Sequence, residues 1–168
     1  DVDEATLPPD VYLSPGIAEP HGPIVLGPAE DYLSADFGYY PGGSIGDLVW
    51  WDLDADGLRD PNEMGIPGVR VRLLDPGANG LCEPSDAVID TAITRILYPN
   101  KGKYLFDPLP AGLYCVDVVE ATLPPDAFLT PGMAEPHGPI ALDPWEDYLD
   151  ADFGYYPGGS IGDLVWLD

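Results

Sequence analysis

The sequence predicts an all-β protein folded as a β-sandwich, and three observations carry this prediction. The chain has 20 glycines and 21 prolines among 168 residues, and proline breaks helices while glycine weakens them. Apolar and polar side chains alternate along Val69–Leu73, which is the two-residue period of a half-buried strand, and the same period assigns opposite faces to successive residues of Leu113–Val118. Turn sequences such as Asn79-Gly80 and Asn100–Gly102 separate these short segments, and short strands spaced by turns are typical of sandwiches.

Six segments are expected to form strands. In chain order they are Leu48–Trp51, Val69–Leu73, Lys103–Phe106, Leu113–Val118, Ile140–Leu142 and Tyr148–Tyr155. In the fourth segment, Tyr114, Val116 and Val118 are expected to point into the core, and Cys115 is expected to point outward. The stretch Leu123–Pro144 contains six prolines, so we expect an extended loop or an edge strand there.

An internal repeat organises the chain. Residues 1–52 recur as residues 117–168, with 42 of the 52 positions identical. The repeat length has the size of a small domain. We interpret residues 1–43 as the C-terminal part of one unit, residues 44–159 as a complete unit, and residues 160–168 as the first strand of the following unit. The connection Tyr155–Gly159 is short, which favours a rod-like tandem array over loosely joined domains.

Charge and composition exclude several classes of protein. The 30 acidic residues outnumber the 6 basic ones and give a net charge of −24, so a nucleic-acid partner, which needs clustered Lys and Arg, is not expected. Hydrophobic residues still make up 45% of the chain, which is too many for a disordered acidic tail. No apolar run approaches the ~20 residues of a membrane span, so we expect no membrane span in this segment.

The twelve residues from Asp52 to Glu63 have the pattern of a calcium-binding loop. A glycine, Gly57, stands at loop position 6, where a sharp turn is needed. The predicted oxygen ligands stand at loop positions 1, 3, 5, 7, 9 and 12; they are Asp52, Asp54, Asp56, the Leu58 carbonyl, Asp60 and Glu63. Side chains at alternate positions and one carbonyl surround a hard cation that needs six to eight oxygens. We therefore predict bound Ca²⁺; Mg²⁺ prefers a tighter octahedron, and the alternative without metal is a solvated acidic turn.

The segments that flank this loop are strands, unlike the helices of an EF-hand. The motif-bearing segments, in order, are Ser44–Gly57, Gly65–Val71, Lys103–Phe106, Leu109–Tyr114 and Asp152–Tyr155. This series resembles the SdrD B-like domains of bacterial surface proteins, and the resemblance spans Ser44–Tyr156. It implies a calcium-stabilised, Greek-key-type β-sandwich of the prealbumin-like or Ig-like kind, arrayed in tandem. Related Cna-B-type domains often carry a Lys–Asn isopeptide crosslink, but the first strand here has no lysine, so no such crosslink is expected.

Two further acidic clusters are candidate cation sites. The degenerate twelve-residue loop Asp75–Asp86 occurs where family members often carry an acidic Gly-rich loop. Its candidate ligands are Asp75, Asn79, Glu83 and Asp86. The alternative is an Asn-Gly turn with scattered acids. The third cluster, beside the unit junction, consists of Asp147, Asp150 and Asp152 together with Glu146. For this cluster the alternative is a solvated strand end.

The two cysteines leave two interpretations open. Two cysteines per unit in an extracellular setting favour a disulfide between Cys82 and Cys115. Because Cys115 is expected to point away from the core, such a bond requires the 75–86 loop to fold back over that face of the sheet. Two free thiols are equally compatible with the pattern.

The histidines do not indicate catalysis. His21 and His137 occupy the same position of the repeat, inside the sequence Glu-Pro-His-Gly-Pro. The sequence carries no nucleophile motif, no phosphate-binding Gly loop and no Cys/His zinc spacing. We therefore interpret both histidines as loop residues and do not expect an enzyme.

Two functions are compatible with these observations. The first is a calcium-stabilised structural repeat of an extracellular fibre or cell-surface stalk, whose partners are neighbouring copies of the same unit. The second is a calcium-dependent adhesin module, in which aromatic residues expected to be exposed bind a surface ligand or glycan; they are Tyr39, Tyr40, Tyr155 and Tyr156. Their position at the junction favours packing between units. The resemblance implies a secreted or cell-surface location in a prokaryote for either function.

Overall fold

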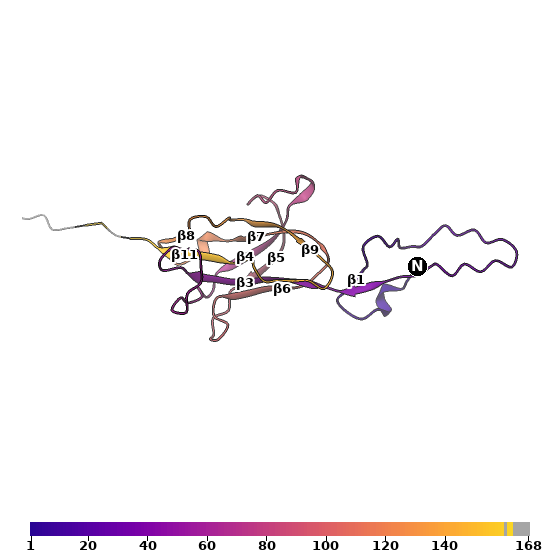
Figure 1. Cartoon of the computed structure of the whole chain (residues 1–168), viewed down its shortest axis with the longest axis horizontal. Coiled ribbons are helices and arrows are strands. Elements are labelled where there is room, and N and C mark those ends of the chain that lie inside the picture. Colours follow the sequence, from indigo (N-terminus) through magenta and orange to yellow (C-terminus); the bar gives the residue numbers. More distant parts are fainter. Residues whose placement is uncertain (160, 163–168) are drawn as a thin grey trace, which may run out of the picture.

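The structure is a computed structural model that describes residues 1–159, 161 and 162. The chain forms a β-sandwich with an elongated N-terminal segment at one end (Figure 1). The described part also contains three 3₁₀ turns: η1 (Glu4–Thr6), η2 (Gly77–Asn79) and η3 (Glu120–Thr122). The predicted first strand of a following unit, residues 160–168, lies outside the described residues except for Ile161 and Gly162.

One sheet of the sandwich is built around its longest strand, β3 (Gly43–Trp51). The strands that accompany β3 are β6 (Lys103–Leu109), β8 (Ala127–Leu129), β10 (Asp147–Tyr148) and β11 (Phe153–Pro157). Strand β6 pairs with β3 antiparallel, whereas β10 and β11 pair with it in parallel, one after the other along its length. Strand β8 forms the edge beyond β11.

The second sheet is antiparallel. Its strands, in spatial order, are β5 (Ala87–Ile93), β4 (Arg70–Asp75), β7 (Gly112–Val118) and β9 (His137–Leu142). The predicted alternation holds in β7, where Tyr114, Val116 and Val118 are all buried in the core. The core lies between the two sheets, because these side chains pack in one cluster with Ile45 of β3 and Phe106 of β6. The prediction of an all-β sandwich is therefore confirmed.

The structure differs from one strand prediction and confirms another. The prediction of a single strand over Tyr148–Tyr155 is wrong. Residues 149–152 do not belong to a strand, and they separate β10 from β11. This interruption lets the chain pair twice with the same side of β3. The proline-rich stretch does hold edge strands, since β8 and β9 each terminate a sheet.

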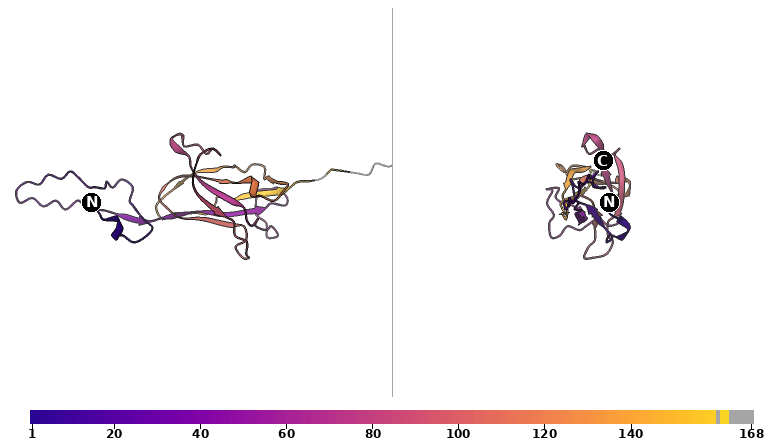
Figure 2. Two further views of the ribbon diagram at one scale, coloured as in Figure 1. Left: turned by 180° about the vertical axis from the view of Figure 1, so that it is seen from behind. Right: turned by 90° about the vertical axis from the view of Figure 1, so that its right-hand side faces the viewer.

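The N-terminal segment repeats part of the sandwich. Strands β1 (Val11–Leu13) and β2 (Tyr39–Pro41) pair antiparallel. Their register is that of β8 with β11, because Tyr12 faces Tyr40 just as Phe128 faces Tyr156. Strand β2 is separated from β3 by a single residue, Gly42. The N-terminal segment and the sandwich thus follow one another along the long axis (Figure 2).

Candidate metal centre

The loop of residues 52–63 is anchored at both of its ends. It begins where β3 ends, and the Asp52 amide donates to the Tyr155 carbonyl of β11 at 2.9 Å. The returning chain pairs with β3 again, because the Trp51 amide donates to the Met64 carbonyl at 2.9 Å and Gly65 forms a bridge with Trp50. The loop is therefore held on the rim of the sandwich by main-chain hydrogen bonds at both its entrance and its exit.

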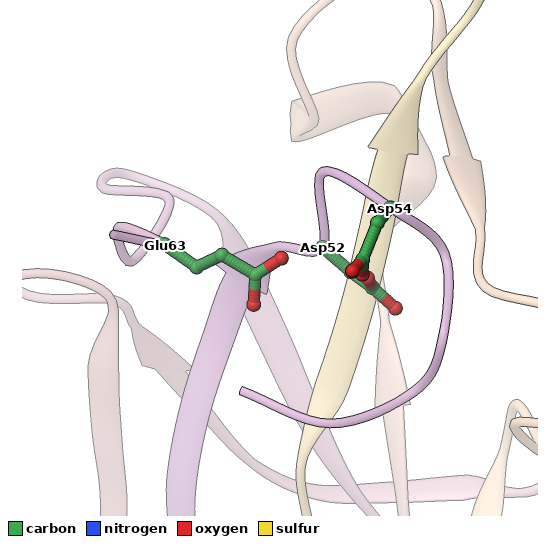
Figure 3. Close-up of side chains that lie close together, drawn as sticks. All are labelled: Asp52, Asp54 and Glu63. Carbon is green, nitrogen blue, oxygen red and sulfur yellow. The ribbon is translucent and has the colours of Figure 1, made fainter. Parts of the chain in front are cut away.

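Three carboxylates of the loop come together. Each of Asp52, Asp54 and Glu63 offers an oxygen atom, and these three atoms lie within 4.8 Å of one another. Figure 3 shows the side chains of Asp52 and Asp54 on one side of the group and that of Glu63 opposite them. The side chains of Asp52 and Glu63 are buried, at 0% and 3% exposure, whereas Asp54 is exposed to solvent.

Asp52 is held by hydrogen bonds from three directions. Its carboxylate accepts from the amides of Asp56, at 3.3 Å, and Gly57, at 2.9 Å. The hydroxyl of Thr130, which follows β8, donates to the same carboxylate at 2.8 Å. Gly57 has a φ of 80°, a conformation that glycine adopts without steric cost. This turn brings the amide of Gly57 back to the first residue of the loop.

Glu63 closes the loop from its other end. Its carboxylate accepts from the amide of Leu53 at 2.7 Å and from the amide of Asp60 at 2.9 Å. The last residue of the loop is therefore hydrogen-bonded to the second. The two buried carboxylates, Asp52 and Glu63, are fixed in place by the backbone of the loop that carries them.

The pKa values of two loop aspartates move in opposite directions. For Asp52, burial opposes ionisation, but the hydrogen bonds from Thr130, Gly57 and other donors outweigh it together and lower the pKa. For Asp54, desolvation and then the charge of Asp56 raise the pKa. A carboxylate whose ionisation is opposed by neighbouring carboxylates gains most from a cation placed among them.

The chemistry of this group fits a hard divalent cation. All the donor atoms are oxygens, which Ca²⁺ and Mg²⁺ prefer. Buried charges in proteins are paired with opposite charges or coordinate metals. Within the described residues, the salt bridges join Arg72 to Asp117 and Lys103 to Asp47, so neither reaches the loop. Asp52 and Glu63 are thus buried acids without a basic partner in this part of the chain.

The other predicted ligands of the loop lie outside the three-carboxylate group. The carboxylate of Asp56 accepts from the Leu58 amide at 2.7 Å, which turns it toward its own segment of the loop. Asp60 uses its amide to bind Glu63, and its carboxylate is not part of the group. The Leu58 side chain is exposed, and its carbonyl remains a predicted ligand.

The two other acidic clusters do not gather in the same way. In the 75–86 loop, Asp75, Asn79 and Asp86 each accept a hydrogen bond from an amide of their own turn, at 2.8 to 3.0 Å. Beside the junction, Asp147 accepts from the Ser44 hydroxyl at 2.6 Å and Asp152 from the Leu48 amide at 3.0 Å. Within residues 1–159, 161 and 162, neither cluster brings three carboxylates close together. The acids concerned are Asp75, Glu83 and Asp86 in the loop, and Asp147, Asp150 and Asp152 beside the junction. Both sites therefore stay predictions.

Cys82 and Cys115 form a disulfide in the structure, with their Cα atoms 5.7 Å apart. Cys115 lies on β7 and points away from the core, as its neighbours predicted, yet it is fully buried. The 75–86 loop folds over this face of the sheet and brings Cys82 to it. Of the two interpretations that the sequence left open, the structure has the disulfide.

Sequence reasoning missed Thr130, which binds Asp52 from a segment distant in the chain. A signal was present in the repeat, because the corresponding residue of the first copy, Ser14, also carries a hydroxyl.

His137 is half-buried, and its Nε2 lies 3.2 Å from the Tyr148 hydroxyl. Burial lowers the pKa of His137, which is consistent with a packing role for the neutral ring.

The family model of the SdrD B-like domain matches residues 43–134, which is more than half of the chain. The chain belongs to the SdrD B-like domain family. The resemblance to this family is therefore confirmed over residues 43–134, and the candidate metal centre lies inside the matched region of this SdrD B-like domain. Strand β3, which leads into the loop, begins at the first matched residue.

Relatives of the SdrD B-like domain occur within much longer proteins. Serine-aspartate repeat-containing protein F of Staphylococcus epidermidis is 41% identical over 88 residues, which are 51% of this chain and 5% of that protein. Bone sialoprotein-binding protein of Staphylococcus aureus is 33% identical over 154 residues, 83% of this chain and 12% of that protein. Colossin-B of Dictyostelium discoideum is 38% identical over 87 residues, 51% of this chain and 2% of that protein. The chain thus spans a small fraction of each relative.

Among solved structures, the crystal structure of GBS52, the minor pilin in Streptococcus agalactiae, matches 76% of this chain and 49% of that chain, with a TM-score of 0.48 at 10% identity. In the part of the SdrD B-like chain that the structure describes, no helix has the length and apolar character that crossing a membrane requires.

Proposed function

We propose that this chain is a segment of a tandem array of calcium-stabilised units that forms an extracellular fibre or cell-surface stalk. In this proposal residues 44–159 are a complete unit, residues 1–43 end the preceding one and residues 160–168 begin the next. Calcium acts as a structural ion, and the partners of each unit are its neighbours. The chain has no catalytic role in this proposal.

The calcium site in this proposal rests on the close approach of the carboxylates of Asp52, Asp54 and Glu63. The three residues stand at positions 1, 3 and 12 of the twelve-residue pattern, and Asp56, Asp60 and the Leu58 carbonyl supply the remaining oxygens once a cation draws them in. Because the chain carries a net charge of −24, a bound divalent cation also offsets repulsion that opposes folding.

Two observations support a location outside the cell. Disulfides such as Cys82–Cys115 form and persist in oxidising, extracellular environments. Membership of the SdrD B-like family, with staphylococcal proteins among the relatives, supports a secreted or cell-surface protein of a prokaryote. Calcium is abundant in such surroundings, so a site of modest affinity is filled there.

Calcium removal tests the proposal directly. Saturating Ca²⁺ should raise the melting temperature by roughly 5–10 °C over the chelated protein, because an ion that binds only the folded state stabilises it by mass action. Limited proteolysis should cut residues 52–63 in chelator and spare them in calcium. Titration calorimetry of the chelated protein should show saturable binding of Ca²⁺, and weaker binding of Mg²⁺.

A pair of matched variants distinguishes calcium binding by the 52–63 loop from a general effect of the protein's negative charge. Asp54→Asn removes one oxygen charge from the group at an exposed position, so the chain should fold but lose most of the calcium-dependent rise in melting temperature. Asp90→Asn removes one charge from the exposed strand β5, outside the loop, and should keep the full rise. A calcium response that Asp54→Asn leaves intact, or that Asp90→Asn abolishes equally, contradicts the proposed site.

One observation favours adhesion as a second candidate function. The turn between β5 and β6 exposes three consecutive apolar side chains, Ile96 at 70%, Leu97 at 79% and Tyr98 at 91%. Arg95 and Lys101, two of the six basic residues of the chain, flank this turn. Exposed apolar groups of this kind occur at protein interaction sites, and one relative is named for binding bone sialoprotein.

The double substitution Leu97→Ser and Tyr98→Ser tests adhesion. If the chain is an adhesin module, immobilised matrix proteins or glycans should bind the unmodified chain and release the variant, while the calcium-dependent melting of both stays the same. Equal binding by the two proteins, or no binding by either, contradicts adhesion through this turn.

A further inference from the structure

The N-terminal segment packs on the sandwich through two tyrosines. Tyr40 of β2 is only 5% exposed, and its hydroxyl accepts a hydrogen bond from the Ala111 amide at 2.8 Å. The hydroxyl of Tyr12, on β1, donates to the Pro108 carbonyl at 3.1 Å, and the two rings lie 6.0 Å apart. We name the pair Tyr12 and Tyr40 the end face of the first copy. The segment Pro108–Ala111, which comprises the end of β6 and the turn to β7, covers it and is here called the receiving turn.

The two glycines that follow this end face lie against the sandwich, Gly42 against the receiving turn and Gly43 against Glu146. A Cβ added to Gly42 would lie 2.8 Å from the Pro108 Cβ and 2.9 Å from the Leu109 amide nitrogen. A Cβ added to Gly43 would lie 2.2 Å from the Glu146 carbonyl oxygen. Both approaches are too close for any side chain, so the sequence Gly-Gly at this junction is explained by the sandwich that packs against it.

Within the described residues, the second copy presents the same end face partly exposed. Phe128 and Tyr156 occupy the positions of Tyr12 and Tyr40 in the same strand register, and their rings lie 5.8 Å apart. Phe128 is 50% exposed, and a Cβ added to Gly159 would meet nothing within 4 Å. Strands β8 and β11, which carry this face, lie at the end of the sandwich opposite the N-terminal segment (Figure 1).

We infer that Phe128 and Tyr156 form a docking surface for a further copy of the unit, which covers them with its receiving turn. The occupant follows from the first copy, where the same pair in the same register is covered by this turn. The inference rests on the tandem arrangement proposed above and adds the contact by which neighbouring units hold one another. The junction is therefore a packed interface of defined residues rather than a bare linker.

The two junctions differ by one hydrogen bond. Tyr156 keeps the hydroxyl that accepts from the amide of the receiving turn, as Tyr40 does. Phe128 lacks the hydroxyl with which Tyr12 donates to the Pro108 carbonyl. Its contact with the next unit is purely apolar, so the second junction is the weaker of the two.

Hydrogen exchange in a lengthened chain tests the docking. A second copy of residues 44–159 is placed directly after Gly159, and the exchange rate of the amide that corresponds to Ala111 is measured in the added unit. Tyr156→Phe should raise this rate about tenfold, because the amide loses its acceptor while the ring stays. Tyr40→Phe in the 168-residue chain is the matched control and should raise the rate of Ala111 itself by a similar factor.

A glycine substitution supplies a second readout. Gly159→Ala should leave the melting temperature of the 168-residue chain unchanged, since nothing surrounds that position. In the lengthened chain it should lower the melting temperature by several degrees, as Gly43→Ala should in either chain. Absence of the exchange effect in the lengthened chain overturns the docking surface, whereas absence of the glycine effect alone shows that Gly159 does not enter the added unit as Gly43 enters this one.

The outcomes also separate this inference from the proposed function. If the added unit melts in a calcium-dependent way but its receiving turn exchanges freely and ignores Tyr156→Phe, the docking fails while the calcium-stabilised repeat stands. If a sugar added to the 168-residue chain protects Phe128 and Tyr156 while the added unit of the lengthened chain does not, a further copy of the unit is not the occupant of the end face. If the added unit does not fold with calcium, the assignment of units fails and the docking falls with it.

Discussion

Two glutamates with the same contacts show how burial decides the behaviour of a single residue. Glu135 accepts from the Tyr155 hydroxyl at 2.7 Å and from the Val118 amide at 3.2 Å. Glu19, its counterpart in the first copy, accepts from Tyr39 at 2.6 Å and from Val2 at 2.7 Å. Burial raises the pKa of Glu135 to about 7, whereas for Glu19 the hydrogen bond from Tyr39 outweighs desolvation and lowers the pKa. The complete sandwich around Glu135 makes the difference.

The raised pKa of Glu135 predicts a pH dependence of stability. The folded state holds the proton up to a pH of about 7, while the unfolded chain releases it near 4.5. The stabilisation is therefore fully present below pH 4.5 and is lost as the pH rises to about 7. At pH 7.5, Glu135→Gln should be more stable relative to the unmodified chain than at pH 4.5, by roughly 1–3 kcal/mol after solvent screening. Urea unfolding at both pH values, with saturating calcium, measures the difference.

Glu19→Gln is the control for this experiment. It removes the same hydrogen-bonding carboxylate from the first copy, where the pKa is lowered rather than raised, so it should not reproduce the effect between pH 4.5 and 7. Asp152 adds a slope of the same sign, because burial raises its pKa to about 6. That contribution is present in all three proteins and cancels in the comparison. If the unfolding free energy of Glu135→Gln changes with pH in the same way as that of the unmodified chain, the raised pKa of Glu135 is contradicted.

At the scale of elements, the 75–86 loop is held by a covalent bond. Its acids bind amides of their own turns, and Cys82 ties it to the buried Cys115 on β7. The disulfide and these turns fix the position of the loop on the outer face of the sheet. A cation site in this loop stays a prediction.

Removal of the disulfide should cost stability without affecting the calcium loop. The bond spans 33 residues, and a crosslink of this length contributes roughly 2–4 kcal/mol, mainly by restricting the unfolded chain. The double variant Cys82→Ala and Cys115→Ala should unfold at lower denaturant and expose residues 76–86 to protease. Its response to calcium should persist, and a reducing agent should destabilise only the unmodified chain. Equal stability of both proteins would show that the bond is not formed in solution.

The strands and the loop were predictable to different degrees, for physical reasons. The period-two pattern of β7 and the spacing from Asp52 to Glu63 are local, so the sequence alone located them. The break between β10 and β11 was not predictable, because Tyr148–Tyr155 is apolar enough for one strand and only the pairing with β3 divides it. Thr130 was missed because its hydroxyl reaches Asp52 from 78 residues away.

At the scale of the whole molecule, one sequence adopts two structures. Residues 137–142 form β9 against β7, whereas residues 21–26, which differ from them at one position, form no strand. The reason is the partner, because the described residues before position 21 include no counterpart of β7. A strand at the edge of a sheet gains its hydrogen bonds from its neighbour and has little stability by itself.

Supplying the missing partner should therefore convert residues 21–26 into a strand. Residues 44–116 placed before Asp1 complete a unit around the first copy. The amides of Ile24 and Leu26 should then exchange at least tenfold more slowly than in the 168-residue chain, and approach the protection of Ile140 and Leu142. Unchanged exchange at these positions would mean that the first copy does not form the same sandwich.

The parallel pairing of β3 with β11 has a mechanical consequence. Residues Val49–Trp51 lie beside Phe153–Tyr155, and the chain enters the sandwich through β3 at one end and leaves through β11 toward the other (Figure 2). Tension applied to an array would draw these two strands past each other along their common direction. Their hydrogen bonds would then be loaded in shear and all at once, instead of opening one by one like a zipper. The sandwich is thereby arranged to resist a pull along its long axis.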